Sequence, residues 1–148
     1  MFEIKENKEL LNQILKTNLL PLAFIGDSVH TLYIREHCLK TSLAKMENYH
    51  KESSFYCKAS AQANVIKELA NANILSDEEK EIVRRGRNAK PKHTAKNASS
   101  SDYSYATAFE VLIGYLYLKG DGNRLDEILR YSIECLSLKS WKQTLDWI

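Results

Sequence analysis

Hydrophobic side chains recur at helical spacing along most of this 148-residue chain. Apolar residues three or four positions apart share one face of an α-helix, whereas a half-buried strand needs apolar and polar residues in alternation. No stretch of the sequence shows convincing alternation, so the pattern predicts an all-α fold. Helices are predicted over 9–17, 21–37, 43–50, 59–70, 77–86, 106–118 and 124–138, with a blurred pattern near 53–56 and a turn at 121–123.

Two of the predicted helices carry start signals. Pro21 suits the first turn of the helix over 21–37, because its φ is already set and no N–H is needed there. Ser76 and Glu79 have the spacing of a capping box, which favours a helix start at Ser76. That helix is expected to fray by Gly86.

The helix over 21–37 contains an unusual interior pair, Gly26 and Asp27. Glycine costs roughly 1 kcal/mol inside a helix, and aspartate is a poor helix former. Asp27 also has apolar neighbours, where an unpaired carboxylate is expensive. We therefore expect a compensating partner: a metal ion, a basic group or an interface.

The helix over 106–118 holds a single charge, Glu110. In one interpretation, Asp27 and Glu110 each face solvent or pair with an arginine. In the other, the two carboxylates converge, and a cation between them offsets their repulsion. Oxygen ligands favour a hard divalent ion such as Mg²⁺. Spacing alone favours neither interpretation.

A basic stretch precedes the Glu110 helix, and no acidic residue occurs from Arg84 to Ser101. Gly86 and Pro91 mark the stretch as irregular. It is either a solvated loop or a surface for a phosphodiester backbone, since arginine forks match phosphate. The candidate contacts are Arg84, Arg85, Arg87, Asn88, Lys90, Lys92, His93 and Lys96.

Composition narrows the class of protein. Hydrophobic residues make up 44% of the chain, charged residues 27%, and the formal net charge is only +2, so any affinity for nucleic acid must be local. The chain shows no signal-peptide pattern and no run of about 20 apolar residues, which indicates a cytoplasmic protein without a membrane span. Three unpaired cysteines and four histidines without ligand spacing suggest no zinc site. His30 is expected to be structural or interfacial rather than a general base.

Several motifs together resemble the ribonuclease III family. Phe24-Ile-Gly-Asp-Ser-Val29 resembles the signature helix of its catalytic domains, and Phe109-Glu-Val-Leu-Ile-Gly114 resembles the second motif, whose glutamate is a metal ligand. The set is most similar to the short bacterial subfamily Mini-ribonuclease III, through 22–27, 33–37, 84–89 and 106–118.

The resemblance implies a fold, an activity and partners. The fold is a ribonuclease III endonuclease-domain-like helical bundle over 1–148, a single domain with no double-stranded-RNA-binding domain. The activity is Mg²⁺-dependent cleavage of double-stranded RNA, with Mn²⁺ as a substitute, leaving 5′-phosphate and 3′-hydroxyl ends. Asp27 and Glu110 carry over as catalytic metal ligands. The partners are the precursor of large-subunit (23S) ribosomal RNA and a second copy in a homodimer, with a helper ribosomal protein left open.

The sequence departs from larger family members at two positions. Ala23 stands where they have a glutamate, and Thr107 stands where they have an aspartate. A site with fewer anionic ligands leaves the number of metal ions open. It also leaves open a catalytically idle, double-stranded-RNA-binding protein on the same scaffold. A helical protein-interaction module is a third alternative, which would show no salt-dependent affinity for duplex RNA.

Overall fold

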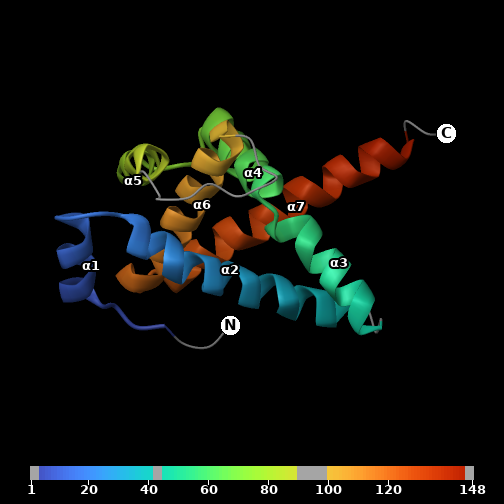
Figure 1. The fold of residues 1–148 in the computed structure, drawn as a ribbon, viewed down its shortest axis with the longest axis horizontal. Helices are drawn as coiled ribbons and strands as arrows, with labels where there is room; N and C mark the ends of the chain where they lie inside the picture. The colour runs from blue at the N-terminus through green and yellow to red at the C-terminus, as the bar shows by residue number, and fades with distance from the viewer. Residues whose placement is uncertain (1–3, 42–44, 90–99, 146–148) are drawn as a thin grey trace.

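The all-α prediction is confirmed: the described chain forms seven helices (Figure 1). The computed structural model describes residues 4–41, 45–89 and 100–145. In chain order the helices are α1 (Lys8–Leu15), α2 (Leu20–Thr41), α3 (Met46–Cys57), α4 (Ala59–Asn71), α5 (Asp77–Asn88), α6 (Ser100–Lys119) and α7 (Gly122–Leu145). No helix in this described part of the chain is long and apolar enough to cross a membrane.

Helix α6 is the central element of the bundle. It packs against α1, α2, α4, α5 and α7, and Figure 1 shows α2 crossing it. Its sequence is apolar on every side rather than along one stripe, as expected for a helix that others surround. The side chains that it buries almost completely include Ala108, Phe109, Val111, Leu112, Ile113 and Leu116.

Two helices are longer than the sequence pattern predicts. The expected fraying at Gly86 is wrong, because α5 continues to Asn88. Gly86 is buried against α6, where an added Cβ would lie 3.0 Å from the Val111 side chain, so packing keeps the helix intact. Helix α6 begins at Ser100 rather than at 106. The rest of the stretch that the sequence predicts to be irregular, 90–99, lies outside the described residues.

Most other differences also lengthen helices, although α1 ends at Leu15 rather than at 17. Helix α3 is continuous from Met46 to Cys57, with no break near 53–56, and the Ser53 hydroxyl donates back to the His50 carbonyl at 3.1 Å. The expected turn at 121–123 is shorter, because Asp121 accepts from the Arg124 N–H at 3.1 Å and α7 starts at Gly122. Helix α7 runs through Leu145.

The predicted capping box is confirmed and has a second role. The Ser76 hydroxyl accepts from the Glu79 N–H at 3.1 Å, and the Glu79 carboxylate accepts from the Ser76 N–H at 2.8 Å. The same carboxylate receives two hydrogen bonds, of 2.7 and 2.8 Å, from the Arg124 guanidinium of α7. Arg124 also donates to the Ile74 carbonyl at 2.8 Å. This buried ion pair joins the start of α5 to the start of α7.

Candidate active site

The site lies where α2 and α6 cross with their backbones in contact. A Cβ on Gly26 would lie 1.9 Å from the Glu110 carbonyl oxygen, and a Cβ on Gly114 would lie 2.0 Å from the Leu22 carbonyl oxygen. Any larger residue would force the helices apart, because real atoms do not approach so closely. The close approach of the two backbones therefore explains both interior glycines, because the packing that it allows offsets the low helix propensity of glycine.

This crossing brings Asp27 and Glu110 together. Asp27 follows Gly26 on α2, and Glu110 is the α6 residue whose carbonyl faces Gly26. The side chains of Asp27 and Glu110 are hydrogen-bonded to each other. Of the two interpretations that the sequence left open, the structure shows the convergent one.

The shared environment holds a proton on Glu110. Burial is the largest cause, and the hydrogen bond to Asp27 and the charge of Asp27 add to it, so the pKa of Glu110 rises to about 9. A buried carboxyl beside another carboxylate stays neutral unless a cation reaches it. Although its neighbours in the sequence are apolar, Asp27 is exposed, and Glu110 is the more enclosed carboxyl.

The His30 side chain of α2 is buried beside the crossing and packs against α6. It is 1% exposed, and the Gln62 side-chain amide of α4 donates to its Nδ1 at 3.1 Å. Its ring meets Phe109 edge-on, with centroids 4.8 Å apart. Burial lowers the pKa of His30 to about 4, although Asp27 opposes the change. A neutral imidazole that is buried and bonded through Nδ1 to Gln62 fits the structural role expected from the sequence rather than that of a general base.

The pair has the donor chemistry of a divalent-cation site, but it is small. Two carboxyl groups in contact present oxygen ligands, and no lysine or arginine of 4–41, 45–89 or 100–145 forms an ion pair with them, which suits a hard cation such as Mg²⁺. Within the described residues, no third histidine, cysteine, aspartate or glutamate joins them. Ala23 supplies no ligand, and the Thr107 hydroxyl donates to the Tyr103 carbonyl at 2.9 Å.

An open cavity of about 330 Å³ lies beside Asp27. Residues of α2 line it: Asp27, Ser28, Thr31, Leu32 and Arg35. Arg35 was not singled out by the sequence, although its position two helical turns after Asp27 was a usable signal. The cavity therefore presents an anionic group and a cationic group along one helix.

The described part of the basic stretch lies on α5 and at its end, and its side chains have different partners. Arg84 pairs with Glu81 at 2.6 Å, and both side chains are more than half exposed. Arg85 donates to the Leu15 carbonyl at 2.7 Å, which caps the end of α1. Arg87 is exposed, as is Asn88. The remaining candidates lie outside the described residues: Lys90, Lys92, His93 and Lys96.

Two cationic side chains lie over the ring of Tyr105, in the N-terminal half of α6. The Arg87 guanidinium lies 4.3 Å from its ring centroid, and the Lys67 ammonium of α4 lies 4.6 Å away. Both contacts are within the range of cation–π attraction. The sequence does not point to Lys67, because no local pattern shows that a residue of α4 and a residue of α5 lie over the same Tyr105 ring.

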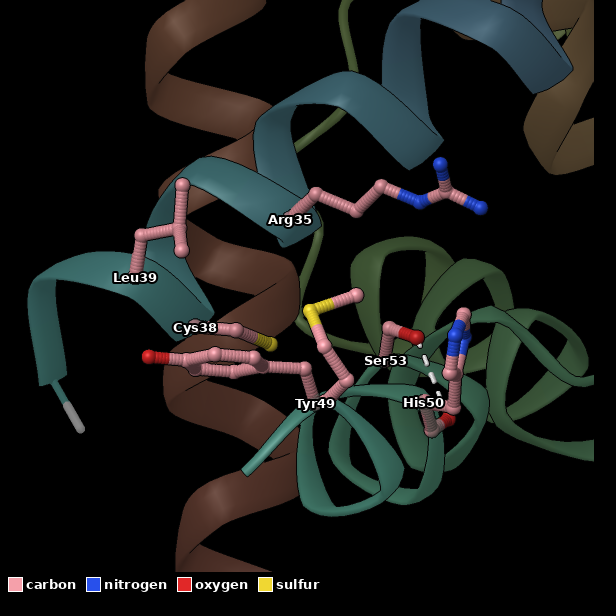
Figure 2. Close-up of a pocket in the computed structure, with 7 residues that line it drawn as sticks. Arg35, Cys38, Leu39, Tyr49, His50 and Ser53 are labelled. Carbon is pink, nitrogen blue, oxygen red and sulfur yellow. Dashed lines mark hydrogen bonds between the residues drawn. The ribbon is translucent and has the colours of Figure 1, made fainter. Parts of the chain in front are cut away.

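A second groove lies between the C-terminal half of α2 and α3 (Figure 2). Its volume is about 190 Å³, and Arg35 lies at its edge, between this groove and the cavity beside Asp27. Figure 2 shows Cys38 and Tyr49 facing each other across it. Burial raises the pKa of the Cys38 thiol, so this thiol is a poor nucleophile.

Comparison with known proteins gives consistent matches. The Ribonuclease III domain model matches residues 20–121. The chain is 45% identical over 138 residues to a Mini-ribonuclease 3 of Thermoanaerobacter sp. (strain X514), covering 92% of this chain and 96% of that protein. It is 45% identical over 125 residues to a Mini-ribonuclease 3 of Brevibacillus brevis, covering 84% and 92%.

The fold is similar to that of a solved structure as well. A crystal structure of a Fusobacterium nucleatum protein matches with a TM-score of 0.71 and 28% sequence identity. The match covers 80% of this chain and 93% of that chain. The matched family segment, 20–121, contains both carboxyl groups of the candidate site.

Proposed function

Because this chain belongs to the ribonuclease III family, and within it to the Mini-ribonuclease 3 group, we propose that it is an endoribonuclease that cleaves double-stranded RNA. The observation that carries the proposal is the contact between Asp27 and Glu110 at the glycine crossing of α2 and α6. Products would carry 5′-phosphate and 3′-hydroxyl ends, as the family resemblance implies.

Asp27 and Glu110 would hold Mg²⁺, or Mn²⁺ in its place. When bound, the ion would act as a Lewis acid and lower the pKa of a bound water. Glu110 would release the proton that burial and Asp27 keep on it, and both carboxylates would then face the cation. With two protein carboxylates, water and RNA phosphate would complete the coordination shell, so metal affinity should rise when RNA is present.

The substrate we propose is the precursor of 23S ribosomal RNA, cut within a duplex in the cytoplasm, by a catalytic unit that spans 1–148. Similarity to the Mini-ribonuclease 3 proteins supports this substrate class. A-form RNA is recognised mostly by shape and backbone contacts, which needs a local basic surface rather than a large net charge. The formal net charge of +2 is compatible with such a surface.

The basic stretch would supply contacts to the RNA backbone, and the described arginines should contribute differently to RNA affinity. Arg87 is exposed, whereas Arg85 is engaged with the Leu15 carbonyl. Arg87→Gln should lower the slope of log affinity against log salt by up to roughly 0.9, the value per phosphate contact on B-DNA. Arg85→Gln should reduce stability more than RNA affinity. Equal salt slopes for wild type and Arg87→Gln would show that Arg87 does not contact phosphate.

We also propose a homodimer through α2. Phe24 is 83% exposed on the helix that carries Asp27, a large apolar side chain that the core of one chain does not use. Burying such side chains is worth roughly 1.5–3 kcal/mol each. A second copy on this surface would put two carboxyl pairs on one duplex. Sedimentation of wild type and Phe24→Ser at micromolar concentration tests this, with a monomeric wild type as the contrary result.

The decisive experiment is cleavage of a defined duplex RNA with Mg²⁺, by wild type, Asp27→Asn and Glu110→Gln. Each variant keeps the side-chain shape and removes a charge that the cation needs, so cleavage should be lost while binding persists. Glu47→Gln, an exposed carboxylate on α3, is the matched control. Full activity of Asp27→Asn would contradict the assignment.

The same assay distinguishes the proposed endoribonuclease from the alternative, a catalytically idle RNA-binding protein. The small number of carboxylates in the described site favours that alternative. It predicts that wild type binds duplex RNA and never cuts it, whatever divalent ion is present.

A further inference from the structure

Arg35 lies in the same cavity as Asp27 and on the same helix. Both residues line the open volume of about 330 Å³, with Ser28 and Thr31 between them. They are eight residues apart, which is roughly 12 Å along the helix axis. The cavity is thus lined by Asp27, one member of the carboxyl pair, and by the cationic Arg35.

The Arg35 guanidinium has no anionic partner among the described residues. Some other described cations do have one: Lys40 pairs with Glu36 at 2.8 Å, and Arg124 pairs with Glu79 at 2.7 Å. Across 4–41, 45–89 and 100–145, no carboxylate lies within ion-pair distance of Arg35, and the residue is exposed. A guanidinium has five donors in a planar fork that matches phosphate oxygens, so Arg35 is free to bind one.

The side chain also points in a useful direction. Figure 2 shows Arg35 extending along α2 toward the N-terminal part of that helix, away from Leu39. Side chains on a helix lean toward its N-terminus, and Asp27 lies in that direction. The Arg35 side chain therefore extends along α2 in the direction of Asp27.

We propose that Arg35 binds a phosphate of the RNA strand that is cut, a short distance along the strand from the phosphate at Asp27 and Glu110. The inference rests on the proposed function and adds a residue to it. One strand of a DNA duplex carries a phosphate about every 3.4 Å of axis, so a span of roughly 12 Å or less corresponds to a few nucleotides. The two anchors would hold one strand at two points.

Arg35 would act as a positioning residue rather than a catalytic one. Fixing the strand at a second point limits the orientations of the phosphodiester at the carboxyl pair, and orientation is a large part of catalysis. Loss of one charge-assisted hydrogen-bonding group corresponds to roughly 10- to 100-fold in affinity. Lysine keeps the charge but loses the fork, so Arg35→Lys should keep the salt dependence and lose less affinity than Arg35→Gln.

The test compares Arg35→Gln, Arg35→Lys and the control Lys40→Gln in the full chain. Binding to a defined duplex RNA is measured against salt in the Glu110→Gln background, where cleavage does not interfere. Cleavage is measured with Glu110 intact. We expect Arg35→Gln to bind roughly 10- to 100-fold more weakly, with a salt slope smaller by up to roughly 0.9. Lys40→Gln should match its parent in affinity, slope and cleavage.

Each contrary outcome has a distinct meaning. Unchanged affinity and salt slope in Arg35→Gln, beside a wild type that cuts duplex RNA, would overturn this inference and leave the proposed function intact. A change of sedimentation in Arg35→Gln, without a change of salt slope per protomer, would overturn it by making Arg35 a contact between copies. A wild type that neither binds nor cuts duplex RNA would overturn both proposals.

Discussion

Replacing Glu110 with glutamine should stabilise the metal-free protein at neutral pH while it abolishes cleavage. The folded state holds the Glu110 carboxyl protonated, because it is enclosed and hydrogen-bonded to Asp27. The unfolded chain exposes the same group to water, where it ionises. Glutamine has the same shape, donates to Asp27 and never ionises, so the variant avoids the cost of keeping a proton on the wild-type side chain.

The size of the effect follows from the two pKa values of Glu110, 4.5 for the ordinary group and about 9 in the fold. At pH 7 the difference from the ordinary value is 7 − 4.5 = 2.5 units. One unit corresponds to about 1.36 kcal/mol, so the wild-type penalty at pH 7 is at most about 3 kcal/mol. Because the folded state binds the extra proton, stability falls as pH rises from 4.5 to 9 and is flat outside that window.

Urea unfolding at pH 5, 7 and 8.5, with chelator present, measures the effect. The free energy of unfolding of Glu110→Gln minus that of wild type should grow with pH, and the difference for Glu47→Gln should not. Saturating Mg²⁺ should reduce the Glu110→Gln difference, since the ion binds the folded wild type in place of the proton. A difference that stays constant from pH 5 to 8.5 would refute the reasoning, because Glu110 would then be ionised in the fold.

Three further predictions test interactions that hold the helices of the bundle in place. Gly26→Ala places a Cβ 1.9 Å from the Glu110 carbonyl oxygen, so it should destabilise the protein by at least about 3 kcal/mol in urea unfolding. Gly122→Ala, whose added Cβ would lie 3.6 Å from the Ile4 side chain, should be neutral or slightly stabilising, and equal effects of the two substitutions would contradict the close crossing. Glu79→Gln removes the closer of the two carboxylates that pair with Arg124 and leaves Glu127 at 3.2 Å, so it should cost less than the roughly 3–5 kcal/mol of a fully buried pair that loses one partner. Arg124 lowers the pKa of Glu79 below 4.5, so this cost should be fully present above pH 4.5 and be lost as pH falls through the lowered pKa of the folded state; an unchanged cost at a pH where Glu79 is protonated in both states would refute the ion pair. The His30 ring should not titrate by NMR until pH falls toward 4, and stability should decline from pH 6.5 to 4 as only the unfolded imidazole takes up a proton; titration near 6.5 would show that His30 is not buried.

The sequence by itself determined the all-α class, the approximate places of the helices and the family. These are local properties: hydrophobic periodicity, the Ser76 capping box and the ordered motifs around Asp27 and Glu110 are all written within short stretches. Helix ends were less predictable. Gly86 is a weak helix former on its own, and only its burial against Val111 explains why α5 continues past it.

Only the tertiary structure decided how the candidate residues meet. Sequence spacing could not say whether Asp27 and Glu110 converge, because 83 positions separate them and the angle between α2 and α6 depends on packing. The glycines at the crossing bring the two backbones into contact and so place the carboxyls together. The same packing engages Arg85 with the end of α1 and leaves Arg35 without a described anion, a distinction between two arginines that no local pattern contains.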